Sequence, residues 1–71
     1  MSFDAALIDV NSAPVEVLGR LPGVDEALAQ RIAAARDDLG GFSSLEDLDV
    51  VLDLPEPTLA RLRDVAVFVP V

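Results

Sequence analysis

The residues with the clearest chemical potential form a tight turn and the start of a helix, in the segment RLPGVDEALAQRI, residues 20–32. Gly23 allows the backbone to reverse tightly, and the amides at the start of the following helix can bind an anion such as a phosphate. Asp25 and Glu26 lie at the mouth of that helix, where a carboxylate repels a phosphate and can cap the helix itself. The segment therefore has two interpretations, a phosphate cradle or a capped turn that only reverses the chain.

Few side chains in the sequence could carry out catalysis. There is no histidine, cysteine, lysine or tyrosine, and no serine lies in a nucleophile motif. The acidic residues Glu46, Asp47, Asp49 and Asp53 lack the spacing and the glycine of a calcium loop, so we interpret them as a solvated helix face. The sequence therefore predicts a non-catalytic domain with no metal and no cofactor.

The charge balance argues against a nucleic-acid role. The sequence has five arginines and thirteen acidic residues, which gives a net charge of −8. A protein that tracks phosphates makes about six to ten phosphate contacts, more than five arginines can supply. Near the turn, Arg20, Arg31 and Arg36 are the only basic residues, and we expect them to pair with neighbouring carboxylates such as Asp37.

The first expected helix lies in the segment NSAPVEVL. Asn11 or Ser12 is the expected N-cap, and Pro14 is tolerated in a first turn because its missing N–H has no helical partner there. If Asn11 is the cap, Val10 and Val15 form a hydrophobic staple.

The second helix is expected to begin at Asp25, as its N-cap, and to end at Gly40 and Gly41. Phe42, which follows the glycines, is expected to fill the core. Apolar residues at helical spacing predict the buried stripe of the second helix: Leu28, Ile32, Ala35 and Leu39.

Two further helices complete the pattern. Ser43 and Glu46 have the spacing of a capping box at the start of the third, and Pro57 suits the first turn of the fourth. The inward-facing residues expected in the two helices are Leu45, Leu48, Leu52, Leu59, Leu62 and Ala66.

A helix, a tight turn and a second helix therefore occur twice, which predicts an all-α, compact bundle of two helix-hairpin-helix motifs joined by a Gly-Gly-Phe connector. We expect a lead-in over residues 1–9, the tandem domain over 10–66 and an apolar tail over 67–71. The hairpin turns are expected near 21–26 and 52–57.

Residues 8–48, IDVNSAPVEVLGRLPGVDEALAQRIAAARDDLGGFSSLEDL, resemble the tandem helix-hairpin-helix domain of ComEA-type competence DNA-receptor proteins. They are also similar to a segment of type II secretion minor pseudopilins. The shared marks are DVNSA, LPG followed by an apolar residue, a helix ending in arginine, a glycine-phenylalanine connector and S-x-E-D-L. The resemblance implies the fold and sequence-independent contact with the DNA backbone.

In DNA-binding members each turn reads Gly-hydrophobic-Gly. The resemblance implies a phosphate site here at Gly23, Val24 and the amides of Asp25, Glu26 and Ala27, with Arg31 and Arg20 assisting. This sequence departs from the pattern, because Asp25 replaces the second glycine of the first turn.

The second turn, Asp53-Leu54-Pro55, departs further from the family pattern. It lacks both glycines, Pro55 offers no N–H, and Glu56 adds charge. We interpret this second turn as structural only, with Leu54 keeping the inward role of the middle apolar residue.

The apolar tail has two interpretations. It closes the core against Phe3 and Leu7, which we favour slightly, or it leaves an exposed patch for a partner at Phe68, Val69 and Val71.

The sequence thus favours a module for protein–protein interaction or self-association whose DNA-backbone site has eroded. The alternative is weak, sequence-independent binding of double-stranded DNA through the first hairpin. No segment approaches membrane-spanning length. We expect a cytoplasmic protein if the chain is full-length, and make no prediction of location if it is a fragment of an anchored or exported protein.

Overall fold

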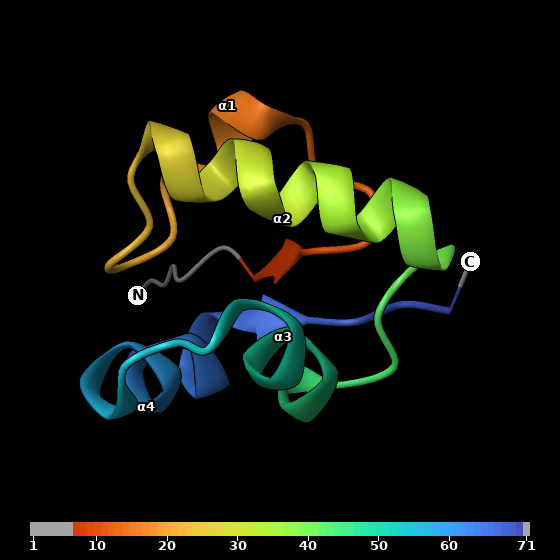
Figure 1. The fold of residues 1–71 in the computed structure, drawn as a ribbon. Coiled ribbons are helices and arrows are strands. Elements are labelled where there is room, and N and C mark those ends of the chain that lie inside the picture. The colour runs from red at the N-terminus through yellow and green to blue at the C-terminus, as the bar shows by residue number, and fades with distance from the viewer. Residues whose placement is uncertain (1–6, 71) are drawn as a thin grey trace.

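The computed structural model describes residues 7–70, which form two helical layers with a pair of very short strands between them (Figure 1). The elements in chain order are β1 (Ile8–Asp9), α1 (Val15–Leu18), α2 (Glu26–Leu39), α3 (Leu45–Leu52), α4 (Glu56–Val65) and β2 (Ala66–Val67). α1 and α2 form one layer, and α3 and α4 form the other. The predicted all-α bundle of two hairpins is confirmed.

The core lies between the two layers, and the two hairpins contribute equivalent positions to it. Leu18 before the first turn and Leu48 before the second are fully buried, as are Ile32 and Leu62 after the turns. Val10, from the segment before α1, is also fully buried. Because each hairpin presents the same apolar positions, the two motifs bury each other's inner faces.

The two strands were not predicted. β1 pairs with β2 in parallel, Ile8 opposite Ala66 and Asp9 opposite Val67. The amide of Val10 extends the pairing by donating to the carbonyl of Val67 at 3.0 Å. Two residues are too short for a period-two pattern to reveal a strand. The pairing places Ala66 in β2, whereas the sequence predicted it on the inner face of the fourth helix.

The predicted start of the first helix is wrong. α1 begins at Val15 with Pro14 as its N-cap, and no side chain caps it. The Ser12 hydroxyl donates instead to Asp9 Oδ2 at 2.7 Å, and the Asn11 side chain turns toward the connector and the tail. With Asn11 outside the cap position, the proposed staple has no basis.

In α2 the predicted N-cap is confirmed and one end of the predicted stripe is wrong. Asp25 Oδ1 accepts the amide of Leu28 at 2.8 Å, and Gly40 ends the helix with a φ of 78°. Leu39 is 54% exposed, whereas Ala29 is fully buried. The inner face is therefore centred on Ala29 and Ile32, and Leu39, the last residue of α2, lies outside it.

The second hairpin corrects another cap. Ser44 rather than Ser43 is the N-cap of α3, without a side-chain bond, so the predicted box with Glu46 is wrong. Asp47 Oδ2 instead accepts the amide of Ser43 at 2.9 Å. Pro57 lies in the first turn of α4, as predicted.

The connector between the hairpins was predicted correctly. Phe42 is 3% exposed and packs in the core. Its ring meets that of Phe68 edge to face, with centroids 6.5 Å apart.

Candidate functional site

The first hairpin turn is built around Gly23, which has a φ of 79°. A Cβ at this position would lie 2.9 Å from Thr58 Oγ1, so the turn packs directly against α4. Val24, the next residue, is 5% exposed and anchors the turn in the core. Its side chain faces inward, so only its backbone could meet a ligand.

The side chain of Asp25 caps the N-terminus of α2. Its carboxylate accepts the Leu28 amide at 2.8 Å and places a negative charge at the helix N-terminus. A helix N-terminus favours an anion, and Asp25 supplies one from within the chain. This bond does not engage the amides of Asp25 to Ala27, which the family resemblance assigns to a phosphate.

The second turn has the same shape built from other residues. Asp53 takes the place of Gly23 with a φ of 53°, and Leu54 takes the place of Val24 at 7% exposed. The amide of Leu54 donates to Asp49 Oδ1 at 3.2 Å. Pro55 is the N-cap of α4 and has no N–H to offer an anion. The second turn therefore keeps the backbone shape of a hairpin turn, but Leu54 and Pro55 offer no free N–H to an anion.

The two turns line one shallow concavity of about 310 Å³. Its lining contains two carboxylates, those of Asp25 and Asp53, and one cation, Arg31. The other lining residues are Gly23, Ala27, Leu28, Leu52, Leu54 and Pro55. The two negative charges outnumber the positive one, so the concavity as a whole disfavours a phosphate.

The predicted phosphate residues do not all meet here. Gly23, Asp25, Ala27 and Arg31 line this concavity, whereas Arg20 and Glu26 line a different one beside α1. A phosphate held by the turn would therefore have Arg31 as its nearby cation.

Arg36 has a structural role that the sequence did not reveal. Its guanidinium donates to the carbonyls of Val10 at 3.0 Å and Ala13 at 2.6 Å, which ties α2 to the segment before α1. The expected pairing with Asp37 is present but long, at 3.9 Å, and is the only ion pair within residues 7–70. Arg36 is thus committed to the fold and adds little to a binding surface.

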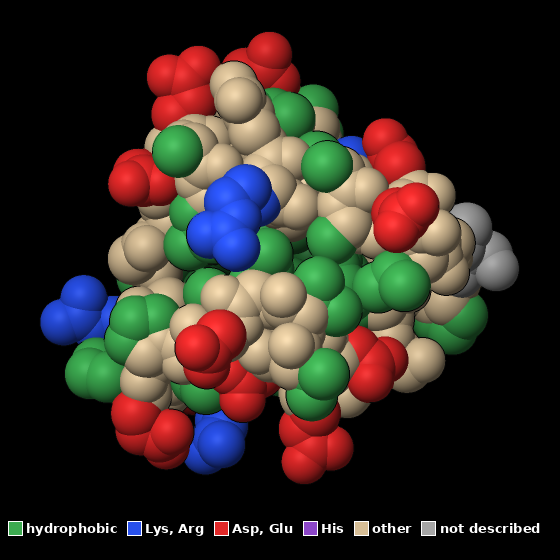
Figure 2. All heavy atoms as spheres, in the orientation of Figure 1, with side chains coloured by type: hydrophobic (Ala, Val, Ile, Leu, Met, Phe, Trp, Pro, Cys, Tyr) green, Lys and Arg blue, Asp and Glu red, His purple; other side chains and the backbone are tan. Residues whose placement is uncertain are grey.

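Figure 2 shows the surface consequence of this composition. On the face drawn, acidic side chains are spread around the molecule, and the few basic side chains stand apart from one another. Apolar side chains fill the seam between the two layers. The face offers no continuous basic stripe of the kind that follows a nucleic-acid backbone.

The predicted interaction residues in the tail differ in exposure. Phe68 is half-buried and packs on the core, and Val69 is 52% exposed. Val71 and Phe3 lie outside the described residues. Leu7, against which the tail was expected to close the core, is 61% exposed. Within the tail, Phe68 therefore packs on the core and Val69 is exposed to solvent.

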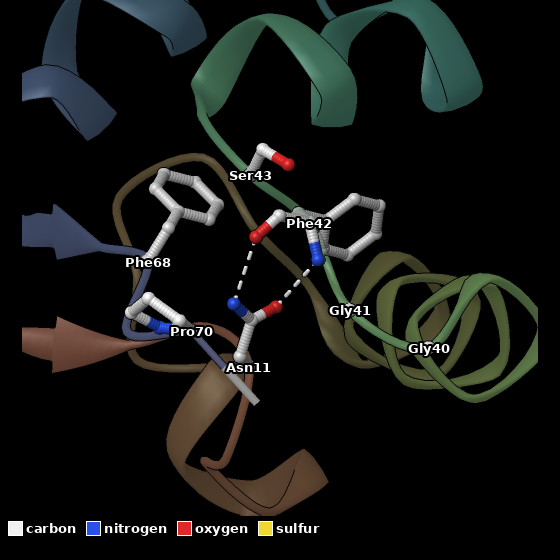
Figure 3. Close-up of a pocket in the computed structure, with 7 residues that line it drawn as sticks. All are labelled: Asn11, Gly40, Gly41, Phe42, Ser43, Phe68 and Pro70. Carbon is white, nitrogen blue, oxygen red and sulfur yellow. Dashed lines mark hydrogen bonds between the residues drawn. The ribbon is translucent and has the colours of Figure 1, made fainter.

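Asn11 holds the tail and the connector together (Figure 3). It is 9% exposed, and its amide nitrogen donates to the carbonyls of Phe42 at 2.8 Å and Val69 at 2.9 Å. Its Oδ1 accepts the amide of Phe42 at 2.7 Å. A small pocket of about 270 Å³ opens beside these bonds, between Phe68 and Pro70 on one side and the connector on the other. Every polar atom of the Asn11 side chain is used inside the fold.

Asp9 anchors the same segment with three accepted bonds. Oδ1 takes the amides of Asn11 and Val69, each at 3.1 Å, and Oδ2 takes the Ser12 hydroxyl. Burial by itself would raise the pKa of Asp9, but these bonds and the charge of Arg36 together lower it below its usual value. The carboxylate is therefore held ionised to support the fold.

Sequence reasoning missed an exposed apolar cluster between the end of α2 and α3. Leu39, Val50 and Val51 line a concavity of about 330 Å³ together with Gly41 and Asp47. The signal was present, because Val50 and Val51 lie off the stripe formed by Leu48 and Leu52. We name this cluster of five residues the Leu39 patch.

Two further findings bear on function. Within residues 7–70, no helix is long and apolar enough to cross a membrane. The same residues contain no grouping of three or more acidic side chains arranged to hold a metal ion.

The fold and its two turns define a tandem helix-hairpin-helix module. The family model for the helix-hairpin-helix motif matches residues 4–66. This chain belongs to that family.

The similar proteins are much longer than this chain. An endonuclease/exonuclease/phosphatase family domain-containing protein 1 of Danio rerio is 46% identical over 56 residues, which covers 79% of this chain and 10% of that protein. The human protein of that name is 43% identical over 56 residues, with the same coverage. An uncharacterised protein of Neisseria meningitidis is 42% identical over 58 residues, 82% of this chain and 8% of that protein. No solved structure matches significantly. The chain thus spans about a tenth of the relatives' length.

Proposed function

We propose that this chain is a non-catalytic helix-hairpin-helix module that works in protein–protein interaction or assembly. The observation that carries the proposal is the pair of carboxylates in the concavity between the turns. Asp25 caps α2 where the family pattern would place a glycine facing a phosphate, and Asp53 lines the same concavity. The net charge of −8 acts in the same direction, because it repels a polyanion at long range.

The exposed apolar side chains support the same function. Soluble monomers rarely leave apolar side chains clustered on the surface unless a partner covers them. Val69 and the Leu39 patch supply such side chains at two places. An acidic surface around apolar side chains suits a basic partner protein.

The test is affinity capture from a cell lysate, with the chain as bait and nuclease treatment before capture. The proposed function predicts a protein that is retained in stoichiometric amount after nuclease treatment. Loss of all captured protein on nuclease treatment, with nucleic acid as the retained ligand, would contradict the proposal.

Weak, sequence-independent binding of duplex DNA is the second candidate function. It is favoured by the first turn, where Gly23 keeps the first glycine of the family pattern with a φ of 79° and Arg31 lies in the same concavity. The resemblance to competence DNA receptors supports it too, as does the word endonuclease in the names of the longer relatives. It predicts binding that is detected at low salt and falls steeply as salt rises.

A further inference from the structure

The Leu39 patch brings together three of the exposed large apolar side chains within residues 7–70. Val50 is 83% exposed, Leu39 54% and Val51 43%. Leu39 ends α2, while Asp47, Val50 and Val51 share the outer face of α3, since residues three and four apart are neighbours on a helix. The shallow concavity of about 330 Å³ between them can admit the tip of an apolar side chain.

The charges around the patch are of one sign. Asp47 lines it, and Asp38, next to Leu39 along the chain, is exposed. No arginine lines the patch, and Arg36, three residues before Leu39, donates its guanidinium to the carbonyls of Val10 and Ala13. An apolar centre with carboxylates around it is complementary to a segment that carries the opposite pattern.

We propose that the Leu39 patch binds a basic amphipathic helix of a partner protein. Apolar side chains on one face of that helix enter the concavity, and its lysines or arginines meet the carboxylates of Asp38 and Asp47. This inference rests on the proposed function and specifies its partner. A second copy of this chain is a poor occupant, because pairing two such patches brings like charges together around the contact.

The experiment uses a fluorescent synthetic peptide of leucine and lysine, about four helical turns long, with the leucines on one face. Two control peptides carry glutamate in place of lysine, or the same composition with the leucines scattered around the helix. Fluorescence anisotropy gives the dissociation constant, and amide chemical shifts locate the contact. We expect the basic amphipathic peptide to bind more tightly than either control, with shifts centred on Gly41, Asp47, Val50 and Val51.

The decisive variant is the double substitution Leu39→Ser and Val50→Ser. Both side chains are exposed, so thermal unfolding should change little, and circular dichroism checks this. We expect affinity for the basic amphipathic peptide to fall at least about tenfold, since each of the two side chains, even when only partly buried by the peptide, contributes to binding. The matched control Leu7→Ser alters an exposed apolar residue outside the patch and should bind like the wild type. Asp47→Asn should weaken binding a few-fold at low salt and not at high salt.

Three outcomes would overturn the inference: unchanged binding in the double variant, shifts centred on Val69, or equal binding of the scattered peptide. A dimer that forms in the wild type and disappears in the double variant would also overturn it, and would assign the patch to a second copy. Failure of this inference can be distinguished from failure of the proposed function. A captured partner protein that binds the double variant normally would reject the patch alone, whereas duplex DNA as the only ligand would reject the function.

Discussion

Gly23 and Asp53 occupy the same position in the two hairpins, and both have a positive φ. This conformation costs a glycine little, but an L-residue pays for the approach of its Cβ to the backbone. Gly23 is restricted a second time by Thr58, which occupies the space where a Cβ would lie. The first turn thus uses glycine to pack against α4, irrespective of any ligand.

Substitution at Gly23 separates backbone strain from the contact with Thr58. We expect Gly23→Ala to lower the free energy of unfolding by about 2–3 kcal/mol, because it adds a clash to the strain of a positive φ. Gly40→Ala is the matched control: its φ is 78° and nothing lies within 4 Å of the new Cβ, so the cost should be about 1 kcal/mol. Urea denaturation measures both. Equal losses in the two variants would contradict the packing role of Gly23.

Glycine at position 53, where the family pattern places it, should stabilise the second turn. Asp53 ends α3 with a φ of 53°, and glycine relieves this conformation, so Asp53→Gly should raise stability by about 0.5–1 kcal/mol. Asp38→Gly, inside the last turns of α2, removes the same charge and should lower stability by about 1 kcal/mol. Thermal unfolding of the two variants distinguishes them. A loss of stability in Asp53→Gly would contradict the account of this turn.

At the scale of elements, the unexpected feature is the segment before α1, where Asp9 and Asn11 bind the tail and the connector. Sequence reasoning assigned Asn11 to a helix cap, a local role that Asn often takes. Its actual partners, Phe42 and Val69, are far away in the chain, and no local pattern encodes them. The cap at Asp25 was predictable because its partner Leu28 lies three residues away in the same helix. The caps predicted at Ser12 and Ser43 are not formed. The Ser12 hydroxyl donates to Asp9 instead, and Asp47 accepts the Ser43 amide.

The bonds accepted by Asp9 predict a dependence of stability on pH. The pKa of Asp9 is lowered from its usual 3.8, so its contribution is fully present above that pH and is lost as the pH falls through the lower folded value. We expect Asp9→Asn to cost about 1–2 kcal/mol at neutral pH, since an amide replaces Oδ2 as the acceptor for Ser12. The gap to the wild type should shrink below about pH 4.

Urea denaturation at a series of pH values measures this gap. Asp64→Asn, an exposed change on α4, is the matched control and should alter stability little at any pH. A gap between wild type and Asp9→Asn that stays constant down to the acid limit would contradict the role of the Asp9 carboxylate.

At the scale of the whole molecule, composition and repetition were enough to predict two helical hairpins and their core. The inner positions follow from helical spacing, as at Leu18, Ile32, Leu48 and Leu62. The Leu39 patch was not predicted as one group, because Leu39 of α2 meets Val50 and Val51 of α3 only once the helices have packed. The concavity shared by the two turns was hidden for a similar reason, since it exists only once the hairpins pack together.

Our central proposal is that the two turns shape the fold without binding DNA. A titration of fluorescent duplex DNA at low salt, with the wild type and Asp25→Gly in parallel, tests it most directly. The account predicts no saturable binding by either protein, because the variant still carries Asp53 in the concavity and a strongly negative net charge. Saturable binding by the wild type that strengthens in Asp25→Gly and weakens steeply with added salt would contradict it.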